Sequence, residues 1–177
     1  MPNSWSDYRA ASASDQAQLD GRRVIPLAYR GQSRFHTSAV ANIAALIGTA
    51  LDKPGTRILN IADPVALSVS EIGASISRHH GYEGTILPVN VGDEKGNAAV
   101  GSTPWSVPAE FTLDTMAATA LGYTPATTYE DAVARTCDWL VAQSGKDWKA
   151  QFPGLTRYSR EFFDYATEDS FLTSAGY

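Results

Sequence analysis

No two glycines in this sequence are separated by a single residue, although the 177 residues include 14 glycines. Proteins usually hold a dinucleotide at such a Gly-x-Gly turn, where backbone N–H groups at a helix start approach the pyrophosphate. Lysine is also absent at the position four residues after each tyrosine, so no phenol has the nearby ammonium that would let it act as a base near neutral pH. These absences predict that the chain alone binds no nicotinamide cofactor and supplies no catalytic residue of the Tyr-x-x-x-Lys type.

Cysteine, basic charge and long apolar runs are scarce as well. Cys137 is the single cysteine, which excludes a disulfide within the chain. The formal net charge of −5 argues against extended contact with nucleic acid. No apolar run approaches the roughly 20 residues that cross a bilayer, and the first residues show no signal-peptide pattern. We therefore expect a cytoplasmic protein with no membrane and no nucleic-acid partner.

Side chains for hydrolysis or for metal binding are few. A Gly-x-Ser-x-Gly string does not occur. His79 and His80 are neighbours on an expected helix and so point in different directions, which is unsuited to a metal site. A small hydrolase that uses His36 or Asp63 is the least favoured alternative, because Ala-Asp-Pro before a helix is more typical of a turn.

Hydrophobic periodicity and breaker residues predict an α/β or α+β fold, with several helices around a small mixed sheet. Strands are expected at 24–27, 57–61, 85–89 and 111–113. Helices are expected at 40–51, at 69–80, briefly between 114 and 122, and at 129–141. We divide the chain into a flexible arm at 1–20, a lobe at 21–143 and an aromatic docking tail at 144–177 that includes a helix over 160–171.

Two of the expected helices have clear sequence signals. Val40, Ile43, Ala44, Ile47 and Leu51 form one apolar stripe, which predicts a helix capped by Thr37 or Ser38. Ser68 and Glu71 have the spacing of a capping box at the start of the next helix, and Gly81 marks its end.

Two segments carry residues suited to binding a small molecule. Arginines and a glutamine gather near the first expected strand, and guanidinium groups suit phosphate or carboxylate, although a solvated strand edge is an alternative role. The proline-stiffened loop 101–108 offers an indole face for a sugar or base, with hydroxyl groups beside it. The predicted substrate-binding residues are Arg30, Gln32, Arg34, His36, Ser102, Thr103 and Trp105.

Residues 19–143 resemble the C-terminal, substrate-binding portion of the extended short-chain dehydrogenase/reductase family, the NAD-dependent epimerase/dehydratases. Three segments carry the resemblance: LDGRRVIPLAYRGQSRFHTSAVANIAALIGTAL, ILNIADPVALSVSEIGASISRHHGY, and FTLDTMAATALGYTP followed by TTYEDAVARTCDWL. Their order and spacing match the family's passages of strand, histidine and helix, of Asn-Ile-x-Asp before a Ser-x-x-Glu helix, and of Leu-Gly-Tyr-x-Pro before a final helix.

The resemblance implies an incomplete Rossmann fold whose N-terminal nucleotide-binding part is missing, as in a fragment, a truncation or a stand-alone relic. NAD or NADP would then belong to a complete enzyme, and the chain would hold its substrate. Nucleotide-sugar members usually have arginine where Gln32 stands and aspartate where Ala39 stands. A smaller carbonyl or hydroxyl substrate is therefore favoured, and a sugar or nucleotide sugar is left open.

Two kinds of partner follow from this reading. The missing nucleotide-binding lobe would cover an apolar interface, and without it a bare interface would lead to self-association. The alternative function is a non-catalytic module that binds a protein or a small molecule through its exposed face and its aromatic tail.

Overall fold

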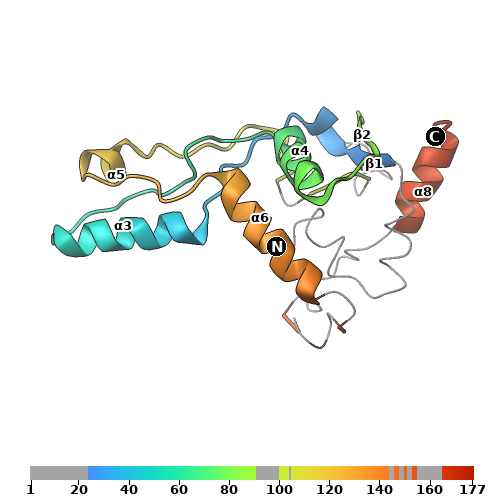
Figure 1. The fold of residues 1–177 in the computed structure, drawn as a ribbon. Coiled ribbons are helices and arrows are strands. Elements are labelled where there is room, and N and C mark those ends of the chain that lie inside the picture. Colours follow the sequence, from blue (N-terminus) through green and yellow to red (C-terminus); the bar gives the residue numbers. More distant parts are fainter. Residues whose placement is uncertain are drawn as a thin grey trace.

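The computed structural model describes residues 24–90, 100–103, 105–143, 146–147, 150, 153–154 and 165–177. These residues form an α/β fold in which five α-helices and one 3-10 helix accompany a two-stranded parallel sheet (Figure 1). Within them, no helix has both the length and the apolar content needed to cross a bilayer. The expected arm at 1–20 lies outside the described residues, as do residues 91–99.

The sheet joins two of the expected strands. Strand β1 (Val24–Leu27) pairs in parallel with β2 (Thr85–Pro88), with Ile25 opposite Ile86. Leu27 is 1% exposed and packs with the helices into the main core. Parallel strands need a crossover connection, and here the chain between them contains α3 (Val40–Asp52) and α4 (Val69–His80). Both strand predictions are confirmed.

Helix α4 has the local signals that its sequence predicted. The Ser68 hydroxyl accepts the Glu71 backbone N–H and the Glu71 carboxylate accepts the Ser68 N–H, so the capping box is formed. Gly81 ends the helix in the left-handed conformation at φ 61°. The inner face buries Val69, Ile72 and Ile76 against α6 (Tyr129–Gln143). Cys137 on α6 is buried in this core.

Helix α3 lies with α5 (Met116–Ala120) on the side away from the sheet (Figure 1). Leu46, Ala118 and Tyr123 form a small separate core there. The helix itself was predicted, but its apolar stripe is not the buried face. Val40 is 80% exposed and Leu51 76% exposed, whereas Asn42 on the other side is fully buried.

Two further expectations are wrong. Residues 57–61 form no strand, and Ile58 is 94% exposed, because no described strand lies alongside to pair with this extended segment. Neither Thr37 nor Ser38 caps α3; the N-cap residue is Ala39, without a side-chain cap of its own. The expected strand at 111–113 is reduced to one parallel bridge between Phe35 and Phe111.

The last described helix, α8 (Tyr165–Ser174), overlaps the helix expected at 160–171. Residues 155–164 lie outside the described residues. Phe171 of α8 packs against the small core of Ala28, Val89 and Val100, and the Gly101 N–H donates to the Glu168 carboxylate. This end of the chain therefore contacts the lobe at the loop that follows residue 100.

Candidate functional site

A cleft of about 400 Å³ lies beside the turn that follows β1. Three of the predicted site residues, Arg30, Gln32 and Arg34, line it together. The lining also includes residues that were not predicted from the sequence, among them Asn90 and Glu110. They come from segments distant in the sequence, so only the folded chain brings them to the cleft.

The cleft is shaped by an unusual backbone turn, the 3-10 helix η1 (Ala28–Gly31). Tyr29, Arg30 and Gly31 are consecutive residues in the left-handed region, at φ 50°, 56° and 67°. For a residue with a Cβ atom this conformation costs roughly 1–2 kcal/mol. The turn places Arg30 at the surface, where its guanidinium forms no ion pair within the part of the chain that the structure describes.

The loop that was predicted to share the site is fastened to this turn. Ala28 N–H donates to the Gly101 carbonyl at 3.0 Å, and Arg30 N–H donates to the Val89 carbonyl. The Ser33 hydroxyl donates to the Val107 carbonyl and accepts the Val107 N–H. Loop and turn therefore form one wall of the cleft.

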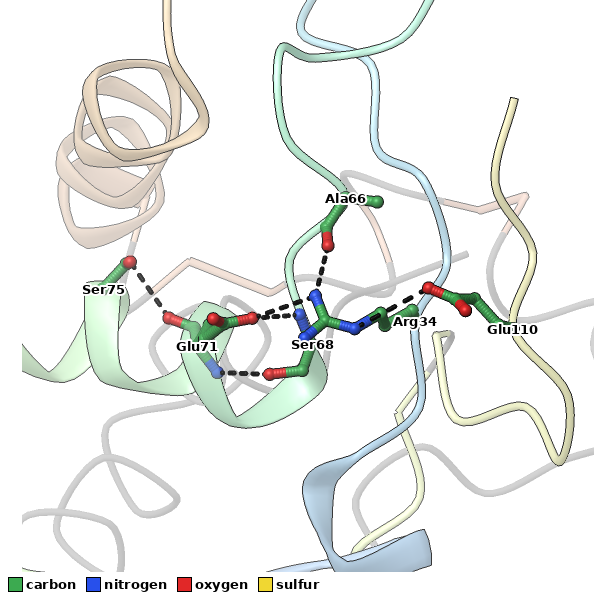
Figure 2. Close-up of polar contacts among 6 residues, drawn as sticks. All are labelled: Arg34, Ala66, Ser68, Glu71, Ser75 and Glu110. Carbon is green, nitrogen blue, oxygen red and sulfur yellow. Dashed lines mark hydrogen bonds and ion pairs between the residues drawn. The ribbon is translucent and has the colours of Figure 1, made fainter. Parts of the chain in front are cut away.

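Arg34 lines the cleft, but its guanidinium is engaged by the protein itself (Figure 2). It donates to the Ala66 carbonyl and to the Glu71 carboxylate, the latter at 3.2 Å, and it lies 3.8 Å from Glu110. The Ser68 backbone N–H, with a further contribution from Arg34, lowers the pKa of Glu71 below its ordinary 4.5. Arg34 consequently positions the two carboxylates, and Arg30 is the more available cation.

His36 uses both ring nitrogens for internal contacts. Its Nδ1 accepts the Leu113 backbone N–H at 3.1 Å, so the proton of the neutral ring is on Nε2, which donates to the Asp63 carbonyl at 2.9 Å. The ring thus joins three segments of chain. The arrangement favours a structural role over the hydrolytic one.

Asp63 is 3% exposed and acts as the cap that α3 lacks. Its carboxylate accepts the Ala39 backbone N–H at 2.7 Å, the Thr37 hydroxyl at 2.6 Å and the Asn42 amide at 2.9 Å. These are charge-assisted bonds at a helix N-terminus, where a carboxylate is stabilised. From the sequence, Asp63 was predicted to lie in a turn, and its role as the cap of α3 was not predicted.

The remaining predicted residues lie elsewhere. Trp105 and His36 line a second, larger groove of about 940 Å³ between α3 and α6, together with Arg135 and Trp139 of α6. The Thr103 hydroxyl is within 3.1 Å of the Ser106 hydroxyl, with which it closes the turn at Trp105. Ser102 and Thr103 line neither hollow. The structure therefore divides the seven predicted residues between a cleft, a groove and a turn.

Tyr123 gives a testable pH dependence near the Asp63 cap. It is 4% exposed, and its hydroxyl has no hydrogen-bond partner among the described residues. Burial, with a contribution from the Asp63 charge, raises its pKa above the ordinary 10.0. Because the fold disfavours the phenolate, the associated stability is present below pH 10.0 and is lost as pH rises through the folded-state pKa.

We expect Tyr123→Phe to raise the free energy of unfolding by about 1 kcal/mol near neutral pH, because it removes a buried unpaired hydroxyl. The gain should grow above pH 10.0. Urea unfolding followed by circular dichroism between pH 7 and 11 measures both effects. Equal stability losses for the variant and the parent chain in alkali would contradict the assignment.

The starts of α3, α4 and α6 do not fit a dinucleotide. The N-terminus of α3 is closed by the Asp63 carboxylate, and that of α4 by the capping box of Ser68 and Glu71. At α6 the Thr128 hydroxyl accepts the Asp131 N–H. A pyrophosphate would meet negative charge in place of free N–H groups at these sites. In addition, no cluster of metal-binding side chains occurs among the residues described.

The described residues thus form an α/β fold with a cleft of about 400 Å³ at the carboxyl end of a parallel strand. No family model matches the sequence, and no curated protein matches it. The chain has a distant structural likeness to the UDP-glucose 4-epimerase of Thermus thermophilus, whose crystal structure contains NAD. The TM-score is 0.44 and the identity 14%, over 73% of this chain. The match spans 41% of the length of that enzyme.

Proposed function

We propose that this chain is the substrate-binding portion of an NAD(P)-dependent epimerase, dehydratase or reductase, and that it is not catalytic by itself. The observation that carries the proposal is the cleft beside η1, where Arg30 offers an available guanidinium next to Gln32. The three sequence segments that resemble the extended short-chain dehydrogenase/reductase family support it independently. The cofactor and the reacting groups would come from a nucleotide-binding lobe that these 177 residues do not include.

The size and charge of the cleft indicate the substrate class. About 400 Å³ lies near the lower end of the range of small-molecule sites, roughly 300–1,000 Å³. It suits a hydroxylated molecule of sugar-phosphate size better than a whole nucleotide sugar. The guanidinium of Arg30 would hold the anionic group, and the amides of Gln32 and Asn90 would meet hydroxyl groups.

The test is calorimetric titration of the chain with glucose 1-phosphate, with methyl glucoside as the uncharged comparison. We expect saturable binding of the phosphate only. Arg30→Gln should weaken that binding about tenfold, since it removes one charge-assisted contact worth roughly 1.4 kcal/mol. The matched control is Arg78→Gln, because Arg78 pairs with Glu130 on the surface of α4 and α6 and lines neither hollow.

Three outcomes would contradict the proposal. One is the absence of saturable phosphate binding, and another is an equal loss of affinity in the two arginine variants. The third is micromolar binding of NADH by this chain alone, which can be followed by the fluorescence of the reduced nicotinamide.

The second candidate function is a protein-interaction module. The observation that favours it is the exposed apolar stripe of α3, where Val40, Ile47 and Leu51 are each more than half exposed. A stripe of this kind is unusual on a soluble monomer. It lies on a different part of the molecule from the cleft, so the two functions are compatible.

A further inference from the structure

Helix α8 lies beside the two-stranded sheet (Figure 1) and shares a small core with the wall of the cleft. Phe171 of α8 packs against three buried residues, Ala28, Val89 and Val100. Tyr29 packs against the same residues and also lines the cleft. Asn90, which directly follows Val89, lines it too. Because closely packed side chains transmit displacement, the position of Phe171 affects both of these residues of the cleft wall.

A hydrogen-bonded path joins α8 to the start of η1. The Glu168 carboxylate accepts the Gly101 N–H at 3.2 Å. The Gly101 carbonyl accepts the Ala28 N–H at 3.0 Å. Gly101 therefore contacts α8 through its N–H and the first residue of η1 through its carbonyl, so that the helix and the turn are positioned through the same residue.

The turn itself needs support from its surroundings. Tyr29 and Arg30 both have left-handed backbone angles, at φ 50° and 56°. Such residues cost free energy and persist only where the surrounding contacts over-determine them. Two backbone hydrogen bonds flank them, from the Arg30 N–H to the Val89 carbonyl and from the Ala28 N–H to the Gly101 carbonyl. The two residues that accept these bonds are also residues that α8 contacts.

Helix α8 buries little of its own surface. Leu172 is its one buried residue, and Ala166, Asp169 and Ser170 are exposed. Segments with few buried apolar contacts separate from a fold at a lower free energy than global unfolding requires. The docking of α8 is therefore a local equilibrium, which can shift while the main core stays folded.

We infer that α8 regulates the cleft: its docking holds Tyr29 and Arg30 in the left-handed turn, and Glu168 is the positioning residue that acts through Gly101. The inference deepens the proposed function and rests on it for the class of ligand. Linkage requires the effect to be reciprocal. A ligand that needs Arg30 in this position must strengthen the docking of α8 by the same factor by which docking strengthens its binding.

The first experiment needs no ligand and follows amide hydrogen exchange by NMR on the full chain. Glu168→Ala removes the acceptor of the Gly101 N–H, and it should speed exchange of the Ala28 and Arg30 N–H groups at least ~5-fold. Glu168→Gln keeps an oxygen that can accept this bond, so exchange should stay within ~2-fold of the parent chain.

Two controls separate this effect from a general loss of stability. The Ile72 N–H donates to the Ser68 carbonyl within the main core, so its exchange reports opening of the core and should not change. Ser170→Ala is the matched variant on α8. Ser170 is exposed, and its hydroxyl donates to the Ala166 carbonyl of the same helix. It should leave the exchange of Ala28 and Arg30 as in the parent chain.

The second experiment measures the consequence for the cleft by calorimetric titration with glucose 1-phosphate. Glu168→Ala should weaken binding at least ~5-fold, whereas Glu168→Gln and Ser170→Ala should stay within ~2-fold of the parent chain. In the parent chain, saturating glucose 1-phosphate should slow exchange of the Gly101 N–H, because the ligand favours the docked helix.

Unchanged exchange at Ala28 and Arg30 in Glu168→Ala overturns the inference. Equal acceleration at Ile72 does so as well, since it would show a general loss of stability, and so does a Glu168→Gln variant that behaves like Glu168→Ala. Parent-like phosphate affinity in Glu168→Ala overturns the inference and leaves the proposed function intact. If the parent chain binds no phosphate, the proposed function fails, and the exchange rates still decide whether α8 holds the turn.

Discussion

Replacing Asn42 with leucine is expected to lower the free energy of unfolding by about 3–5 kcal/mol, the range for breaking a buried polar network. Asn42 is fully buried, and its amide nitrogen donates to the Asp63 carboxylate and to the Thr127 carbonyl. Its amide oxygen accepts the backbone N–H groups of Ala126 and Thr127. Leucine fills a similar volume but leaves these groups, including the buried carboxylate, with fewer partners.

Urea unfolding at neutral pH measures this loss, and Asn60→Leu is the matched control. Asn60 is exposed, and its amide donates to the Asp114 carbonyl at 3.0 Å. Surface changes of this kind usually alter stability by less than roughly 0.5 kcal/mol. If the two variants lose similar amounts, the network around Asn42 does not have the role assigned to it.

Asn42 also shows which feature of the fold could not be predicted from the sequence, namely the buried side of α3. The three residues that its side chain binds lie 21 to 85 residues away in the chain, and a buried asparagine has no local signature. The apolar period of α3 predicted that a helix forms, because that depends on residues within a turn of one another. It could not predict which side is buried, because the buried side is set by Asp63 and by the segment at 126–127.

An element whose signals lie within its own segment could be predicted with its ends. Helix α4 begins at its capping box and ends at Gly81, and both signals are contained within the segment. The segment at 57–61 had the composition of a strand, but a strand also needs a neighbour to accept and donate its backbone hydrogen bonds. Ile58 is exposed because the described chain provides none.

In the candidate site, too, features set by neighbouring residues could be predicted and features set by distant residues could not. The cluster of Arg30, Gln32 and Arg34 was visible in the sequence because the three residues are close together along the chain. Their separate roles were not visible, since the carboxylates that engage Arg34 come from α4 and from residue 110. Asn90 could not be selected either, because its place in the cleft depends on the pairing of β1 with β2.

Gly101→Ala is expected to lower the free energy of unfolding by about 2–5 kcal/mol, from backbone strain together with overpacking. Gly101 has φ +63°, and a Cβ atom there would lie 2.8 Å from the Ala28 nitrogen and from the Pro26 carbonyl. These are backbone atoms of β1 and of the turn that follows it, so they cannot move aside as a side chain would. The loop must separate from the turn, and the wall of the cleft separates with it.

Gly81→Ala isolates the steric part of that loss. Gly81 has nearly the same backbone angle, φ +61°, but a Cβ atom there would meet nothing within 4 Å. Gly81→Ala should therefore lower the free energy of unfolding by only about 1 kcal/mol, the cost of placing alanine in the left-handed conformation. Glucose 1-phosphate binding should disappear in Gly101→Ala and persist in Gly81→Ala, measured at a temperature where both are folded. Intact binding in Gly101→Ala would mean that the cleft wall does not depend on the contact between Gly101 and β1.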